Sequence, residues 1–533
     1  MAFDLPVKAR NGQIPFVLRG HAMHESYKRF LMLIHNNRYL LLLALSLILS
    51  VILRVPYFQY HFIFVDEAWW ANGAKVLLQG GQLYLNIGLD KNPPIFWFCA
   101  FLFKIFGVSM IVVHAGALLL VCITSVLLFM LGTRFFSASV GAGAALIYAV
   151  ASTTYYIPRI VGMNTETLMI VFSTVAAFSY LQGLLDARRS SFFIAGLFAS
   201  FAFLTKPVSI TEMAFLALFV IFAGGGGILA RFRSLVLLAA GFALGFGTFL
   251  TYLFRAGILS AWWEQAILYE IRYVGRIGAE RFLVKSLGVG AGFALIFAWL
   301  LILIWLSRRM KWKHSLAYTF VAYWLLSAFA GVAIGRRYYA NYFIQVMPPL
   351  SLLGAMGLVY LWNNRHQVSA RLVRRVCCAA FLVSFLWFHS RTLANWCYLV
   401  FPQVRHTQHW DMWHEDQKNL DIARRLRRGS STHDRIFVWG SNPQLFFLAE
   451  RSMATIWMDF DVADDYPPRA EERSIQALTA ETLSRNRPRY IVDAQRVARL
   501  ENFPDFRDLV EKYYDLEAEV AGVRLFRLRQ EDP

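Results

Sequence analysis

The 533-residue chain is too apolar for an ordinary soluble domain, because 57% of its residues are hydrophobic and only 16% are charged, against about 25% in soluble domains. Its net charge of +19 is typical of basic loops that face anionic lipid. No recognised nucleic-acid-binding module accompanies that charge, and the five cysteines lack zinc-ligand spacing. We therefore expect an integral membrane protein with no nucleic-acid partner, structural zinc or disulfide framework.

Apolar runs close to the spanning length of about 20 residues recur along the first three quarters of the chain. The first run, Tyr39–Leu53, lies too far from the N-terminus for a signal peptide and is followed by no small-residue cleavage site. Further spans are predicted near 110–131, 138–157, 165–183, 191–205, 208–223, 234–254, 284–306, 315–335, 343–362 and 373–392. The apolar stretch 95–107 is either re-entrant or interfacial. The pattern predicts a mainly α, polytopic membrane bundle of about 11 to 13 helices.

Lysine and arginine in alternate gaps set the predicted orientation. The basic groups lie in 1–38 and near 134, 188–189, 231–233, 308–313 and 365–375, and they all fall on one side, which we take as cytoplasm. The opposite side then carries the loops 57–94 and 255–283, the turn 335–337 and everything after about 393. This side is predicted to be the periplasm of a bacterial inner membrane. The aromatic loop 255–283 is either an amphipathic segment in the membrane interface or an ordinary loop.

Three domains are predicted. A cytoplasmic segment (1–38) precedes the transmembrane module (39–398), and a soluble periplasmic domain (399–533) follows. In the last part, strand patterns at 434–441, 488–494 and 522–528 alternate with helical patterns at 442–451 and 469–486. Such alternation is typical of a small α/β domain.

The loop 57–94 carries the residues best suited to chemistry. Asp66 and Glu67 follow the apolar "HFIFV" and precede two tryptophans, so we expect them against the membrane face, where poor solvation raises a carboxylate's pKa and makes it a stronger base. A short amphipathic helix, 68–81, should end at Gly80-Gly81. Asp90 and Lys91 then precede Pro93-Pro94. The competing interpretation is a solvated loop start.

Further cations are predicted on the same outer side. Arg336 and Arg337 could grip a phosphate through paired N–H groups, or simply snorkel to the interface. Tyr338, Tyr339 and Tyr342 beside them could stack on a sugar or form an aromatic belt. Lys206 lies near a helix end, where a lysine is either paired or functional. Arg54 is either an ion partner of Asp66 or a membrane-end anchor.

The order of these motifs resembles the GT-C glycosyltransferases, specifically family 39 with its bacterial protein mannosyltransferases and lipid A aminoarabinose transferases. The resemblance rests on the acidic loop with its K-x-P-P turn, where Asn92 is inserted into the usual K-P-P. Four later segments resemble family segments in the same order: "MNTETLMIVF" (163–172), "GLFASFAFLTKPVSI" (196–210), "GRRYYANYFIQVMPPLSLL" (335–353) and "IFVWGSNPQLFFLAERSMAT" (436–455).

The resemblance implies an inverting transfer of a sugar from a polyprenyl-phosphate carrier to a hydroxyl of a lipid, glycan or protein. Asp66 would be the base, Glu67 its support and Glu166 a second carboxylate, while Lys91 would meet the donor phosphate. Because the leaving group departs as a phosphate, cations such as Arg336, Arg337 and Lys206 would stabilise the developing charge.

Metal use and function class stay open at this stage. Asp66, Glu67, Asp90 and Glu166 could hold a hard divalent ion, although no spacing in the sequence demands one. The main alternative function is a secondary transporter or flippase-like envelope protein, but the paired half-repeats typical of transporters are not found. A non-catalytic scaffold of envelope assembly is the third possibility.

Overall fold

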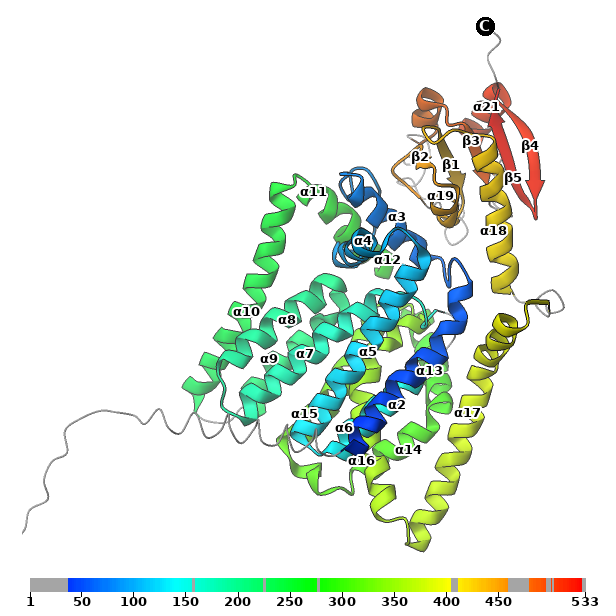
Figure 1. Cartoon of the computed structure of the whole chain (residues 1–533). Helices are drawn as coiled ribbons and strands as arrows, with labels where there is room; N and C mark the ends of the chain where they lie inside the picture. The colour runs from blue at the N-terminus through cyan, green and yellow to red at the C-terminus, as the bar shows by residue number, and fades with distance from the viewer. Residues whose placement is uncertain are drawn as a thin grey trace, which may run out of the picture.

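The computed structural model describes residues 37–155, 159–223, 227–275, 279–403, 411–458, 479–494, 500 and 503–529. Nearly all of the predicted N-terminal segment lies outside these ranges, as does most of the predicted helix 469–486. Within them, the chain forms a bundle of long helices with a small sheet at one end (Figure 1).

The bundle contains every predicted span. Its helices are α2 (Asn37–Arg54), α5 (Met110–Phe135), α6 (Ala138–Ala151), α7 (Thr165–Leu185), α8 (Ser190–Thr205), α9 (Ile210–Ala223), α10 (Ile228–Arg255), α13 (Ala279–Ile296), α14 (Ala298–Ser307), α15 (Leu316–Ile334), α16 (Met347–Asn363) and α17 (Val368–Val400). Short 3-10 turns join several of them: η1 (Val55–Gln59), η2 (Pro207–Ser209), η4 (Lys311–His314) and η5 (Ala340–Val346).

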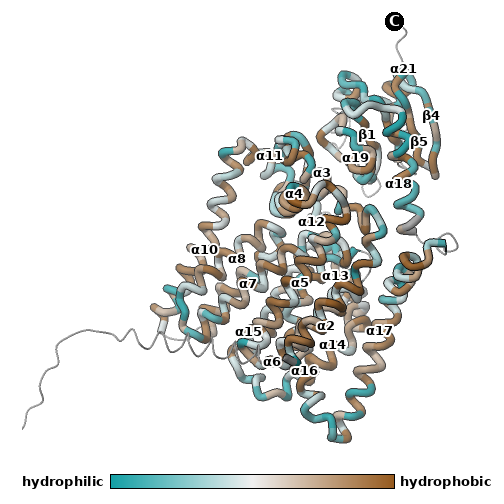
Figure 2. The backbone as a smooth tube through the Cα atoms, viewed as in Figure 1, coloured by the Kyte–Doolittle hydropathy of each residue, from teal (hydrophilic) through white to brown (hydrophobic). Residues whose placement is uncertain are grey.

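Among the described residues, seven helices are long and apolar enough to cross a membrane, and an eighth span is formed if the bent pair α13–α14 counts as one. This pair bends by 79°. Three further predicted spans correspond to the shorter apolar helices α6, α8 and α9. Hydrophobic residues cover most of these helices, as the brown tube in Figure 2 shows. The chain is therefore a polytopic membrane protein.

Small residues allow some of these helices to pack at close range. A Cβ atom on Gly196 of α8 would lie 1.9 Å from the carbonyl oxygen of Leu238, and one on Gly241 of α10 would lie 2.0 Å from that of Phe193. Close backbone approach through small residues is a common basis of helix association in membranes, where the hydrophobic effect between helices is absent. Glycine at both positions therefore holds α8 against α10.

Several short helices lie together at one end of the bundle (Figure 1): α3 (Asp66–Leu78), α4 (Pro94–Phe106), α11 (Leu259–Trp262), the π-helical turn η3 (Trp263–Leu268) and α12 (Tyr269–Gly275). We refer to this end as the loop side. The predicted helix 68–81 is confirmed as α3, and Gly80 beyond it has a φ of 79°, a conformation that glycine adopts without strain.

The described residues 259–275 of the predicted loop are helical, and they pack onto the first loop. The indole of Trp262 donates to the side chain of Asn92 at 2.8 Å. Gln265 accepts from the backbone of Leu89 at 3.0 Å and donates to the carbonyl of Tyr84 at 2.9 Å. Asn92, the inserted residue of the K-x-P-P turn, thus fixes α11 against the start of α4.

The C-terminal part contains a five-stranded sheet in the order β2-β1-β3-β5-β4. Its strands are β1 (Arg435–Trp439), β2 (Ser452–Met453), β3 (Tyr490–Asp493), β4 (Tyr514–Val520) and β5 (Val523–Leu528), with helices α18 (Asp411–Arg428), α19 (Gln444–Ala449) and α21 (Pro504–Tyr513). Strand β1 is parallel to both β2 and β3, and β5 is antiparallel to β3 and β4. The predicted strands at β1, β3 and β5 and the helix α19 are confirmed, whereas α18, α21 and β4 were not predicted.

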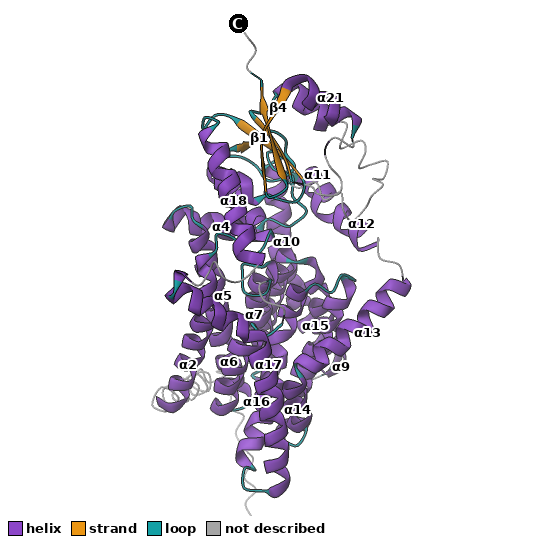
Figure 3. Cartoon of the chain, turned by 90° about the vertical axis from the view of Figure 1, so that its right-hand side faces the viewer, coloured by secondary structure: helices purple, strands orange, loops and turns teal. Residues whose placement is uncertain are grey.

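The sheet unit contacts the first loop directly, above the bundle in Figure 3. The backbone N–H of Gly88 donates to the carbonyl of Ile456 at 2.7 Å, and the side chain of Asn72 in α3 donates to the carbonyl of Pro443 at 3.0 Å. His61 contacts Asp416 of α18 at 3.1 Å. The loop that carries the acidic residues is therefore held between bundle and sheet.

Candidate active site

Asp66 is the first residue of α3, half-buried at the loop side. Burial raises the pKa of its carboxyl from 3.8 to about 6, and Asp90 and Glu166 act in the same direction, while Lys91 and Arg159 oppose the shift. An acid whose pKa lies near the working pH is suited to accept a proton. Asp66 is thus a candidate general base surrounded by charges of both signs.

Glu67 has a different environment, because it is fully buried. Its carboxylate accepts from the backbone N–H of Ile63 at 2.8 Å and of Met163 at 2.9 Å, and it contacts the imidazole of His114 at 3.1 Å. With both oxygens engaged away from solvent, Glu67 ties the start of α3 to the segment before α7. We therefore keep as a prediction the supporting role that the resemblance implies for Glu67.

Lys91 lies between two carboxylates. Its ammonium donates to Asp90 and, at 2.6 Å, to Glu270 of α12. Burial lowers the pKa of Lys91, but the two carboxylates outweigh burial and raise it well above its usual value. The lysine is therefore charged, and the inserted Asn92 does not move it away from Asp66, on whose carboxyl it acts electrostatically.

A second ion pair joins Glu166 and Lys206. Glu166, at the start of α7, is fully buried and binds the ammonium of Lys206. It also accepts from the side chain of Asn341 at 3.0 Å. The Lys206 ammonium lies 4.0 Å from the ring centre of Tyr342. Glu166 and Lys206 thus meet at the loop side, but they are bound to each other.

Tyr339 connects the surroundings of Asp66 to another group of cations. Its ring lies 5.2 Å from the guanidinium of Arg159 and 5.9 Å from the ammonium of Lys285. Its hydroxyl is 3.1 Å from that of Tyr273. Arg337 lies over the ring of Tyr273 at 3.8 Å, so the two tyrosines stand between Arg159 and the cations of α13.

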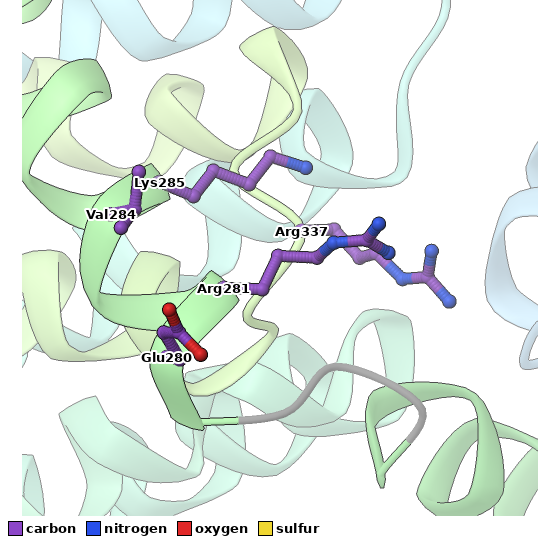
Figure 4. Close-up of a pocket in the computed structure, with 5 residues that line it drawn as sticks. All are labelled: Glu280, Arg281, Val284, Lys285 and Arg337. Carbon is purple, nitrogen blue, oxygen red and sulfur yellow. The ribbon is translucent and has the colours of Figure 1, made fainter.

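Those cations line a cavity of about 660 Å³, bounded by Glu280, Arg281, Val284, Lys285 and Arg337. Figure 4 shows Arg281 and Lys285 extending from α13 to the same side as Arg337. Three basic groups around an open cavity are suited to an anionic ligand, above all a phosphate. Arg336 is absent from this lining and lies 5.7 Å from the ring centre of Phe282.

Arg54 is not brought to Asp66. Its guanidinium is 1% exposed and donates to the hydroxyl of Ser152 at 2.9 Å and to the carbonyl of the same residue at 3.3 Å. It is also absent from the charges that act on Asp66. The alternative of an ion partner for Asp66 is therefore wrong, and the membrane-end anchor stays a prediction.

Within the described ranges, no three histidine, cysteine or carboxylate side chains gather into a group that could hold a metal ion. Asp90 and Glu270 bind the ammonium of Lys91.

The apolar bundle thus carries an acidic helix start and a basic cavity at one end. Residues 90–254 match the family described as dolichyl-phosphate-mannose-protein mannosyltransferase. Together with the solved structures described next, this match confirms the resemblance inferred from the motifs. No curated protein matches the chain in sequence.

Among solved structures, the chain is similar to ArnT from Cupriavidus metallidurans bound to undecaprenyl phosphate, with a TM-score of 0.63 at 14% identity, covering 91% of this chain and 97% of that one. It is also similar to the oligosaccharyltransferase AglB from Archaeoglobus fulgidus in complex with an inhibitory peptide and a dolichol-phosphate, with a TM-score of 0.51 at 12% identity over 93% and 75% of the two chains. The GT-C fold is thus shared.

Several residues at the site were not predicted from the sequence: Arg159, Glu270, Arg281, Lys285 and Asn341. Each comes from a segment far in sequence from the acidic loop, such as Glu270, which lies 179 positions from its partner Lys91. A basic residue at a helix start, as at Arg281, was the available signal, but the same pattern is typical of ordinary membrane-end anchors.

Proposed function

We propose that the chain transfers a glycosyl group from a polyprenyl-phosphate-linked donor to a hydroxyl of an acceptor, with inversion at the anomeric carbon. Asp66 takes the hydroxyl proton, the acceptor oxygen forms the new bond to the anomeric carbon, and the bond from that carbon to the phosphate oxygen breaks. The carrier leaves as a polyprenyl phosphate anion. The undecaprenyl phosphate and dolichol-phosphate in the similar structures support a donor of this kind.

The position of Asp66 is the observation that carries this proposal. Its carboxyl is half-buried at the loop side, with a pKa of about 6 and with Lys91 and Arg159 acting on it. Above that pH the carboxylate is ionised and can accept a proton, while its partial burial keeps it a stronger base than an exposed aspartate. No acid is needed at the leaving oxygen, because cleavage of the phosphodiester donor releases polyprenyl phosphate, which is a stable anion.

We place the donor phosphate in the basic cavity. Arg281, Lys285 and Arg337 line its wall, and their positive charge opposes the negative charge that grows on the phosphate as its bond to the sugar breaks. Tyr339, between Lys285 and Arg159, lies on the line from this cavity toward Asp66. In this role Tyr339 faces the sugar, and Lys206 and Glu166 hold the helix ends around it.

We also propose that the loop side faces the periplasm of a bacterial inner membrane. The basic loops predicted as cytoplasmic connect the opposite ends of the helices, in agreement with the excess of Lys and Arg on cytoplasmic loops. In this orientation the sheet unit is periplasmic and stands where a lipid, glycan or protein acceptor would approach. A protease added to intact spheroplasts should therefore cleave the sheet unit and spare the basic loops.

The experiment that tests the reaction is transfer from a radiolabelled polyprenyl-phosphate sugar by purified Asp66→Asn protein. We expect transfer to fall by about a hundredfold or more, since a positioned base typically contributes about 10²–10⁴ in rate, with normal accumulation in the membrane. Asp421→Asn, in an exposed ion pair of α18, is the matched control and should keep full activity. Undiminished transfer by Asp66→Asn would refute the assigned base.

A further inference from the structure

Arg54 is a buried cation that has no role in the proposed transfer reaction. It ends α2 inside the bundle, and only 1% of its surface is exposed. An arginine side chain keeps its charge in proteins, and burying a charge without a partner is costly. A buried guanidinium therefore needs a compensating negative charge nearby.

No carboxylate supplies that charge among the described residues. The guanidinium donates through Nη2 to Ser152 alone, and its Nε and Nη1 have no hydrogen-bond partner. The titratable groups that act on it are Tyr148 and Cys122, both of which are neutral at pH 7 in their ordinary state. Hydrogen bonds to Ser152 satisfy part of the guanidinium but do not neutralise it.

Two further polar side chains lie within electrostatic reach of Arg54. The hydroxyl of Tyr148 on α6 is buried and has Thr124 on α5 as its side-chain hydrogen-bond partner. His389 on α17 is 5% exposed and has an unpaired Nε2. Buried polar groups are almost always hydrogen-bonded, so the two unpaired N–H positions of this buried cation point to a missing acceptor.

We propose that Arg54 binds a small monovalent anion of the chloride class between α2, α5, α6 and α17. The free N–H groups of Arg54 would bind it, with the Tyr148 hydroxyl as a further donor. A single halide ion supplies the missing charge and accepts from several donors at once. This inference does not depend on the proposed transfer reaction, because it concerns a separate cluster of residues.

The anion would stabilise the two segments that lead to the acidic loop. Arg54 immediately precedes η1, which continues toward Asp66, and Ser152 ends α6 before the segment that holds Arg159. A filled anion site therefore ties both segments to the bundle. Stability of the folded protein should then depend on the kind of anion in solution.

The test is the thermal unfolding midpoint of the purified full chain in detergent, titrated with sodium chloride or bromide against sodium gluconate at constant ionic strength. We expect a saturable rise in the midpoint with halide for the wild type. Tyr148→Phe, which removes one hydroxyl and keeps the ring, should need several-fold more halide for the same rise. Arg134→Gln, which breaks an ion pair with Asp186 elsewhere, should behave like the wild type.

A structure determined in bromide locates the ion. Anomalous density beside the Nε and Nη1 atoms of Arg54 supports the site. A midpoint that responds equally to halide and gluconate, or identical halide dependence in Tyr148→Phe and wild type, overturns it.

Discussion

Asp66 and Glu67 are adjacent in sequence, yet their carboxylates meet different surroundings. Asp66 is half-buried near cations such as Lys91. In contrast, Glu67 is enclosed by two backbone N–H groups and His114. The sequence predicts that this acidic pair lies at the membrane face, but the two roles cannot be separated from it. Which carboxylate turns inward depends on Met163 and His114, which reach it from distant segments.

The pH dependence of transfer should report the Asp66 carboxyl. Its pKa is raised in the folded state from 3.8 to about 6, so kcat/KM should rise with pH through about 6 as the base ionises. The free energy of unfolding should change in the opposite direction, because the raised pKa of Asp66 means that its protonated form favours the folded state. This contribution to stability is fully present below about pH 4 and is lost as the pH rises through about 6. A kcat/KM profile that is flat between pH 5 and 7 would contradict the assignment.

Glu67→Gln should destabilise the protein more than a surface change does. The Glu67 carboxylate accepts from two buried backbone N–H groups, and each hydrogen bond to a charged group contributes about 1.5–3 kcal/mol. We expect a clearly lower thermal midpoint for Glu67→Gln. Glu264→Gln, at an exposed position of η3, should stay within about 0.5 kcal/mol of the wild type, and equal midpoints for the two variants would show that Glu67 is not a positioning residue.

Arg336 and Arg337 should differ although they are neighbours. Arg337 lines the basic cavity, whereas Arg336 lies over Phe282. Losing a hydrogen bond to a charged group costs about 1.5–3 kcal/mol, so Arg337→Ala should raise the apparent Michaelis constant for the donor about tenfold or more. Arg336→Ala should raise it less. Steady-state kinetics with the lipid-linked donor measure both, and the reverse order would place the phosphate elsewhere.

At the scale of elements, helix α12 positions Lys91 through an ion pair with Glu270. Glu270 on this helix and Asp90 on the first loop share the ammonium. The helical character of 255–283 is predictable from its aromatic spacing, but its partner is not, because that pairing spans 179 positions. The predicted spans agree with the structure because each apolar run is a continuous stretch of the sequence and needs no distant partner to be recognised.

Glu270→Gln should weaken the hold of α12 on Lys91 without removing the lysine. With one carboxylate gone, Lys91 exerts more of its positive charge on Asp66, and that charge lowers the carboxyl's pKa. The ascending limb of the kcat/KM profile should therefore shift to lower pH than in the wild type. An unshifted limb, together with unchanged donor kinetics, would show that Glu270 acts only on the packing of α12.

At the scale of the whole molecule, the bundle and part of the sheet follow from the sequence, while their contact does not. Strands β1, β3 and β5 are apolar runs bounded by turns, but β4, with the sequence "YDLEAEV", is largely exposed and acidic. Helix α18 is strongly polar and carries no apolar run. The pairing of Gly88 with Ile456 depends on the folded shape of both parts and leaves no local signature.

Gly88→Val should loosen the sheet unit from the first loop. A Cβ atom at Gly88 would lie 2.5 Å from the indole of Trp457, so the valine side chain forces the two apart. We expect faster cleavage between bundle and sheet in limited proteolysis. Gly247→Val, where a Cβ atom meets nothing within 4 Å, is the control and should be cleaved as slowly as the wild type.

The backbone bond between Gly88 and Ile456 would also carry force between the sheet and the first loop. Lys91 follows that joint closely in the chain, so a pull on the sheet from outside the membrane would be transmitted to the ammonium that acts on Asp66. A bulky acceptor or a neighbouring protein that binds the sheet would thereby change the rate of the proposed transfer by displacing Lys91, without entering the bundle.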